Sequence, residues 1–181
     1  MRWLLVLVLI VSTSLAHAQA APSADEPLAP DGQRRIDLRA LGAVPVNGTF
    51  GMVPMVGLGG GFSYAARDWA IAASADLGGG PRGHILALSA SAHAYVDPTD
   101  QSFFYGGGIS FLDLRISGES GDAVASPFIE LGFAACRTCA ASFVSSFRAD
   151  VPFRKLRLEG DDGVHREGYV LPLSFRVGVS L

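Results

Sequence analysis

The chain has 181 residues, of which 49% are hydrophobic and 17% charged, and its formal net charge is -3. This length favours a single domain, and so apolar a composition excludes a disordered chain, which would be polar and highly charged. A nucleic-acid-binding protein usually carries a net positive charge on its binding surface, and the net negative charge of this chain argues against that function. Beyond the first residues no apolar run reaches about 18 residues, so the sequence holds no helix that spans a bilayer.

The first residues have the order of a secretory signal peptide. Arg2 precedes an apolar run at residues 3–11, and small residues follow at a spacing suited to cleavage. A short buried helix is the alternative, but the order of these features favours the signal peptide. We therefore expect residues 1–18 to be removed on export, with cleavage after Ala18 or after Ala20.

The next segment, residues 19–33, shows no periodicity. It contains Pro22, Pro27 and Pro30, and proline lacks a backbone donor and fixes its φ angle. We expect a flexible N-terminal tail here, followed by one folded unit at residues 34–181.

From residue 34 onward the dominant period is two. The clearest example is the closing segment, whose apolar positions are Tyr169, Leu171, Leu173, Phe175, Val177, Val179 and Leu181. Successive side chains of a strand point to opposite faces, so this segment predicts a strand with one apolar face.

The same alternation recurs in seven earlier segments, at about 35–44, 52–64, 69–77, 84–96, 101–116, 128–135 and 141–153. In segment 101–116 the apolar residues change parity after Phe111, to Leu112 and Leu114, which predicts a bulge near Phe111. Eight strands is the smallest number for a closed membrane barrel.

The connections between these segments alternate in length. Those at 65–68, 97–100 and 136–139 are short, whereas those at about 46–51, 78–83, 117–126 and 154–167 are longer and richer in glycine or charge. This pattern is typical of an outer-membrane barrel, with short periplasmic turns and longer extracellular loops.

The less apolar face decides between a soluble and a membrane barrel. Gly57, Gly59 and Gly61 would be unusual on a strand face exposed to water, but in a narrow lumen they would make room for charged side chains. We therefore predict an all-β fold, an eight-stranded antiparallel up-and-down transmembrane β-barrel, with a soluble barrel or sandwich as the alternative. The predicted lumenal charge network comprises Asp37, Arg39, Asp76, Glu130, Arg148, Asp150 and Arg176.

Three stretches carry a family resemblance: residues 130–133 (ELGF), 148–153 (RADVPF) and 169–175 (YVLPLSF). On these, region 34–181 resembles the small bacterial outer-membrane β-barrel proteins of the OmpA-transmembrane and OmpX type, although such proteins usually end in Phe or Trp and this chain ends in Leu181. The resemblance implies a bacterial outer-membrane location, contact with outer-membrane lipid and lipopolysaccharide, and insertion by the barrel-assembly machinery.

Cys136 and Cys139 are the two cysteines of the chain and bracket a short connection. The ends of a tight turn approach closely enough for a disulfide, and an exported protein folds in an oxidising compartment. The two cysteines could form a structural disulfide or remain inert thiols. A redox-active pair is disfavoured because it would precede a helix, and a zinc site is disfavoured because it needs about four ligands. We expect no cofactor and no metal.

These features favour a structural or surface-binding role in the envelope, without a wide pore, because eight strands enclose an interior that side chains fill. A lipid-modifying enzyme, such as a lipid A hydrolase, is one alternative. Its candidate groups would be His93, Ser89, Ser91 and Asp76. Their predicted face is the lumen and not the lipid, so we expect no catalytic residue.

The longest connection suggests the other alternative, a loop-mediated adhesin or lipopolysaccharide binder. Loops carry function more often than frameworks do, although a charged loop is equally typical of a merely solvated surface. The possible surface-binding residues are Arg154, Lys155, Arg157, Asp161, Asp162 and Arg166. The sequence gives no prediction of oligomeric state.

Overall fold

The computed structural model describes residues 32–47, 51–116, 120–121, 123–159 and 165–181. The predicted signal peptide and nearly all of the predicted tail lie outside these residues, and the first strand already includes Gln33. In the described part of the chain, no helix has the length and apolarity needed to cross a membrane.

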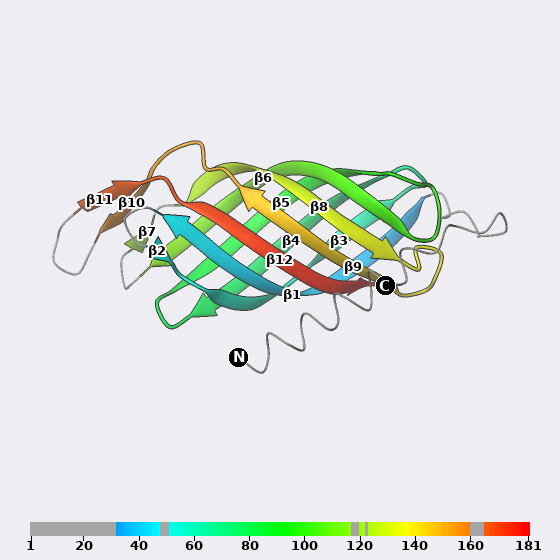
Figure 1. Cartoon of the computed structure of the whole chain (residues 1–181), viewed down its shortest axis with the longest axis horizontal. Helices are drawn as coiled ribbons and strands as arrows, with labels where there is room; N and C mark the ends of the chain where they lie inside the picture. Colours follow the sequence, from blue (N-terminus) through cyan, green and yellow to red (C-terminus); the bar gives the residue numbers. More distant parts are fainter. Residues whose placement is uncertain (1–31, 48–50, 117–119, 122, 160–164) are drawn as a thin grey trace.

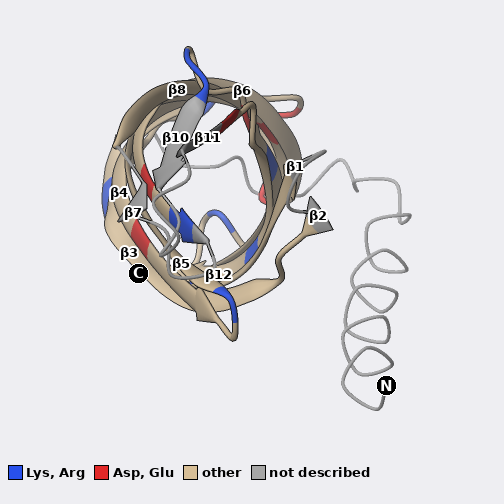
Figure 2. Cartoon of the chain, turned by 90° about the vertical axis from the view of Figure 1, so that its left-hand side faces the viewer, with Lys and Arg blue, Asp and Glu red and all other residues tan. Residues whose placement is uncertain are grey.

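Eight long strands of the described chain close into a barrel (Figure 1). They are β1 (Gln33–Asn47), β3 (Met55–Ala65), β4 (Trp69–Gly80), β5 (Gly83–Tyr95), β6 (Ser102–Ile116), β8 (Val124–Ala135), β9 (Ser142–Asp150) and β12 (Leu171–Ser180). Each pairs antiparallel with the next, and β12 returns to β1, from Asp37 opposite Ser180 to Val46 opposite Leu171. Figure 2, which looks along the barrel, shows the resulting ring. The predicted eight-stranded up-and-down barrel is confirmed.

Four short strands lie at one end of this barrel, which we call the loop end. They are β2 (Gly51–Met52), β7 (Ser120–Gly121), β10 (Leu156–Glu159) and β11 (His165–Gly168). Strands β7, β10 and β11 form a separate three-stranded sheet that extends beyond the barrel (Figure 1). This sheet was not predicted, because strands of two to four residues are too short for a period of two to be recognised.

The opposite end, the turn end, carries the three connections β3–β4, β5–β6 and β8–β9. At the loop end the expectation of a longer connection at 78–83 was wrong. Strand β4 continues to Gly80 and β5 begins at Gly83, which leaves Pro81 and Arg82 as a two-residue hairpin. Glycine backbone pairs in a ladder without needing a side chain to pack, so the glycine-rich stretch extends the strand.

The two faces of the strands differ as their alternation predicts. Outward side chains such as Leu58 and Phe62 are 72% and 69% exposed, whereas Asp76 and Arg148 on the inward face are 1% and 0% exposed. A barrel whose large apolar side chains point outward and whose charges point inward has the polarity of a membrane barrel and not of a soluble one.

The predicted bulge near Phe111 was wrong. The pairing of β5 with β6 runs without interruption from Gly83 opposite Ile116 to Tyr95 opposite Phe104. Leu112 and Leu114 therefore keep the inward parity of β6 and are 1% and 0% exposed. They are apolar because they pack inside the barrel.

These leucines belong to an apolar layer that fills the lumen at the loop end. Its members are Leu41, Ala43, Val53, Met55, Ile85, Ala87, Leu112, Leu114, Val124 and Val170. Below this layer, toward the turn end, the interior is polar. The interior thus changes character along the barrel axis, which the sequence analysis did not predict.

Candidate functional site

Asp76 of β4 is the centre of the polar interior. Its Oδ1 accepts a hydrogen bond from Arg39 Nε at 2.7 Å, and its Oδ2 accepts one from Arg176 Nη2 at 2.6 Å. Gly59 faces Asp76 across the β3–β4 pair, and a Cβ on Gly59 would collide with the Asp76 carboxylate. A glycine on β3 therefore provides the space for this buried ion pair.

Glu130 of β8 extends the same network. Its Oε1 lies 3.5 Å from Arg176 Nη1 and accepts a hydrogen bond from Ser146 Oγ at 2.5 Å, while its Oε2 lies 3.2 Å from His93 Nε2. Because Arg176 contacts both Asp76 and Glu130, one chain of charges crosses the lumen from β1 to β8.

Arg148 and Asp150 form a second pair, two residues apart on the inward face of β9. Arg148 Nε donates to Asp150 Oδ2 at 2.8 Å, and Nη2 lies 2.5 Å from Oδ1. The guanidinium stacks on the Phe128 ring at 3.4 Å and donates to Ser89 Oγ at 3.0 Å. Bidentate hydrogen bonds between arginine and a carboxylate are among the stronger charge-assisted contacts, and stacking on an aromatic ring adds a cation–π interaction.

Asp37 is the seventh residue of the predicted network and lies apart from both groups, where its Oδ1 accepts a 2.5 Å hydrogen bond from Ser180 Oγ. All seven residues thus lie on the inward face, six of them in two ion-paired groups. Buried charges are tolerated when they are paired in this way.

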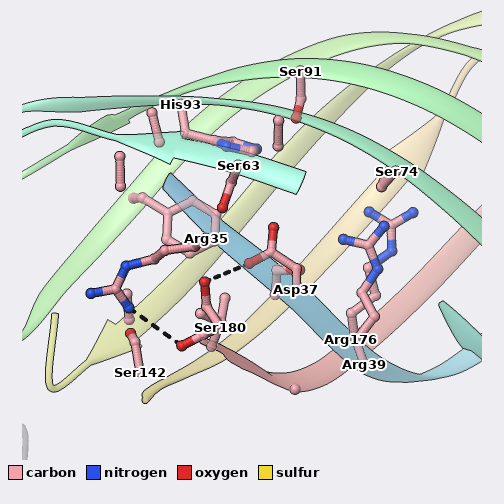
Figure 3. A pocket seen from close by; sticks show the side chains of 18 of the residues that line it. Arg35, Asp37, Arg39, Ser63, Ser74, Ser91, His93, Ser142, Arg176 and Ser180 are labelled. Atoms are coloured by element: carbon pink, nitrogen blue, oxygen red, sulfur yellow. Dashed lines mark hydrogen bonds between the residues drawn. The ribbon is translucent and has the colours of Figure 1, made fainter. Parts of the chain in front are cut away.

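A cavity of about 100 Å³ lies between this network and the turn end. Figure 3 shows Arg35, Asp37 and Arg39 of β1 on one side, with His93 of β5 opposite and Arg176 of β12 beside Arg39. The cavity is polar and of a size to hold a few water molecules.

Arg137 closes the turn end and was missed by the sequence analysis. It lies between Cys136 and Cys139, and it is only 5% exposed. Its guanidinium stacks on the Tyr95 ring at 3.5 Å and donates four hydrogen bonds of 2.8 to 3.2 Å to backbone carbonyls. The acceptors are Ala66, Arg67, Asp97 and Thr99. Burial lowers the pKa of Arg137 from its ordinary value, although an arginine stays charged in proteins.

Tyr95 consequently lies inside the barrel mouth. Membrane barrels carry aromatic residues at both membrane interfaces, and Trp69 and Phe103 are exposed on the outside of this barrel near the short turns. Tyr95 instead lines the cavity beneath Arg137. Its inward parity on β5 was visible in the sequence.

A disulfide joins Cys136 to Cys139. The Cys139 N–H also donates to the Cys136 carbonyl at 3.1 Å, and Cys136 has a φ of 56°, a left-handed conformation that is uncommon for a residue with a side chain. We call residues 136–139 the stapled turn. The sequence predicted the possible disulfide but not what the turn contacts.

The groups considered for catalysis are engaged with other partners. His93 pairs with Glu130, Ser89 accepts from Arg148, and Asp76 holds two arginines. In the described part of the chain, no cluster of three or more His, Cys, Asp or Glu side chains is placed to hold a metal ion.

Four of the six predicted surface-binding residues belong to the described part of the chain, and they lie at the loop end or beyond it. Arg154 Nη2 donates to the Ala123 carbonyl at 3.1 Å, and Lys155 Nζ lies 6.0 Å from the centre of the Tyr169 ring. Arg157 belongs to β10 and Arg166 to β11, which pair as a hairpin. Asp161 and Asp162 lie outside the described residues.

No protein-family model matches this chain, and no curated protein matches its sequence. Several solved structures share its fold, and three of them are described below. Neisserial surface protein A is 13% identical, with a TM-score of 0.65 over 82% of this chain and 96% of that one. The outer membrane protein OprG of Pseudomonas aeruginosa is 12% identical, with a TM-score of 0.56 over 85% and 98%.

The third is the attachment invasion locus protein Ail of Yersinia pestis, solved in complex with the heparin analogue sucrose octasulfate. It is 13% identical, with a TM-score of 0.52 over 83% of this chain and 97% of that one. At these identities the likeness establishes the fold alone. The chain described here has the fold of the small eight-stranded outer-membrane β-barrels.

Proposed function

We propose that this protein is a structural barrel of the bacterial outer membrane whose interior is closed to solutes. The observation that carries this proposal is the filling of the lumen. The apolar layer occupies the loop end, and two ion-paired groups occupy the middle. Eight strands leave little space beyond what these side chains fill.

Planar-bilayer recordings test the closed interior. We expect no large, stable openings from the refolded wild-type barrel. The double variant Leu112→Ala/Leu114→Ala removes the two most buried leucines of the apolar layer and should produce measurable leak currents. Its matched control, Ile109→Ala/Phe111→Ala, changes outward side chains of the same strand and should stay closed. Large openings of the wild-type protein would overturn the proposal.

The outer-membrane location is supported by the exposed apolar side chains on the outside of the barrel and by the fold shared with outer-membrane proteins. In this proposal the signal peptide directs export, and the barrel-assembly machinery inserts the chain into outer-membrane lipid. Folded membrane barrels resist unfolding by detergent, so the protein from an outer-membrane fraction should migrate differently on a gel when heated and unheated. Recovery in the periplasm with no effect of heating would exclude this location.

We further propose a non-enzymatic role. The residues that would form a hydrolase site face the lumen, where His93, Ser89 and Asp76 are each bound to other side chains, and the barrel wall separates them from lipid acyl chains.

A second candidate function is surface binding through the loop end. It is favoured by the small sheet of β7, β10 and β11, which extends beyond the barrel and whose sequence includes Arg157, Glu159 and Arg166. Lipopolysaccharide phosphates are a suitable partner for its arginines, because guanidinium groups bind phosphate through two parallel hydrogen bonds.

Binding of purified lipopolysaccharide to the barrel in detergent tests this candidate. The double variant Arg154→Gln/Arg157→Gln should bind roughly tenfold more weakly, as expected for the loss of charge-assisted contacts. Arg67→Gln, which changes a turn at the opposite end, should bind like the wild type. Equal affinity of all three proteins would remove the hypothesis.

A further inference from the structure

The stapled turn spans the mouth of the barrel. Around the ring the strands follow the order β1, β3, β4, β5, β6, β8, β9 and β12. Two strands separate the β8–β9 turn from the β3–β4 turn on either side, so these turns lie opposite each other. Arg137 in the first donates to the carbonyls of Ala66 and Arg67 in the second. Its side chain therefore crosses the opening.

Other contacts attach the stapled turn to the rest of the mouth. Arg35 on β1 donates to the Arg137 carbonyl at 2.6 Å and to the Cys139 carbonyl at 3.3 Å. Asp100 in the β5–β6 turn accepts hydrogen bonds from both the N–H and the hydroxyl of Thr138 at 2.6 Å. The stapled turn is thus held from β1 and from both other turns.

Behind this turn lies the polar cavity. Arg137 and Tyr95 line it, together with Arg35 and His93, which Figure 3 labels. Because Arg137 is both part of the cavity wall and the side chain that bridges the mouth, its release would give solvent and small molecules a wider path to the interior.

The position of Arg137 depends on the disulfide. Cys136 has a left-handed backbone conformation, and the bond to Cys139 closes the four-residue loop that holds it there. With free thiols, Cys136 can return to an ordinary conformation, and the backbone that orients Arg137 moves with it. Both cysteines are half-buried rather than sealed in a core, so a thiol reagent can approach.

We propose that the Cys136–Cys139 disulfide is a reversible modification site that controls access to the polar cavity. Its reaction partner would be a dithiol, such as a dithiol oxidoreductase of the envelope. One reductant thiolate attacks one cysteine sulfur and displaces the other as a thiolate, and the second reductant thiol resolves the mixed disulfide. Two electrons and two protons pass to Cys136 and Cys139, and the dithiol becomes a disulfide.

The test measures access to His93, which lines the cavity, with diethyl pyrocarbonate as the probe and mass spectrometry as the readout. His84 is exposed at the loop end and serves as the internal standard. The samples are folded barrels in detergent micelles: oxidised wild type, wild type reduced with dithiothreitol and freed of it, Cys136→Ser/Cys139→Ser, and Arg137→Gln. Arg67→Gln is the matched control. Heat-dependent gel mobility verifies that each sample is folded.

We expect His93 to react roughly tenfold faster in the reduced protein, in the double serine variant and in Arg137→Gln, because the closed state loses hydrogen bonds from a charged group. His84 and the Arg67→Gln control should not change. If His93 in the double serine variant reacted at the wild-type rate, access to the cavity would not depend on the disulfide. Unchanged reactivity of Arg137→Gln would overturn the role of the bridging side chain. These results do not depend on whether the barrel conducts ions.

Discussion

Single residues decide how charge fits inside so narrow a barrel. The alternation of the sequence predicted that Gly57, Gly59 and Gly61 face the lumen, and the structure shows what one of them accommodates. Gly59 lies opposite Asp76 in the strand register, where a Cβ would occupy the place of the carboxylate. The ion pair of Asp76 therefore requires a residue without a side chain at position 59 of β3.

Replacement of Gly59 by alanine should therefore destabilise the barrel. The added methyl group would push Asp76 away from Arg39 and Arg176, and overpacking of this kind costs about 1 to 3 kcal/mol. Gly79→Ala is the control, since a Cβ there meets no atom within 4 Å. Urea unfolding of the two variants in lipid vesicles should show a loss of stability for Gly59→Ala alone. Equal stability would mean that Asp76 moves aside without cost.

Individual strands are less uniform than their period suggests. Strand β6 keeps one inward parity from Phe104 to Leu114, but its inward residues are glycine and serine in the middle and leucine near the loop end. The sequence alone predicted a bulge because it equated an apolar side chain with the outward face. Apolar side chains do point outward in the middle of the barrel. At the loop end, however, the apolar layer fills the lumen, and apolar side chains there also point inward.

A pair of substitutions on β12 tests the assignment of faces in the middle of a strand. Val177 points outward, between Ala40 of β1 and Ser145 of β9, whereas Ser174 points inward and is buried. Val177→Arg should cost about 2 to 4 kcal/mol if the residue lies near the bilayer midplane, and Ser174→Asn should cost less. The free energy of unfolding in vesicles measures both, and equal costs would mean that the faces are wrongly assigned.

At the scale of the whole molecule, closure of the ring brings together residues that are distant in the chain. Arg176 meets Asp76 100 residues away, and Arg35 meets the backbone of Arg137 102 residues away. Both contacts require that β12 and β1 pair. The closed ladder also leaves no unpaired strand edge, which is why a β-structure can lie in lipid at all. The ion pairs, the apolar layer and the stapled turn all depend on this closure.

The sequence by itself determined the eight strands, their up-and-down order and, except at the loop end of β6, the side of each strand that faces inward, because the period of two is a local property of an extended backbone. It also identified seven of the inward charges and the cysteine pair. The tertiary structure alone decided which charges meet, since partners are set by the register between strands far apart in the chain. Only closure of the barrel made Leu112 part of an interior layer and carried Arg137 across the mouth.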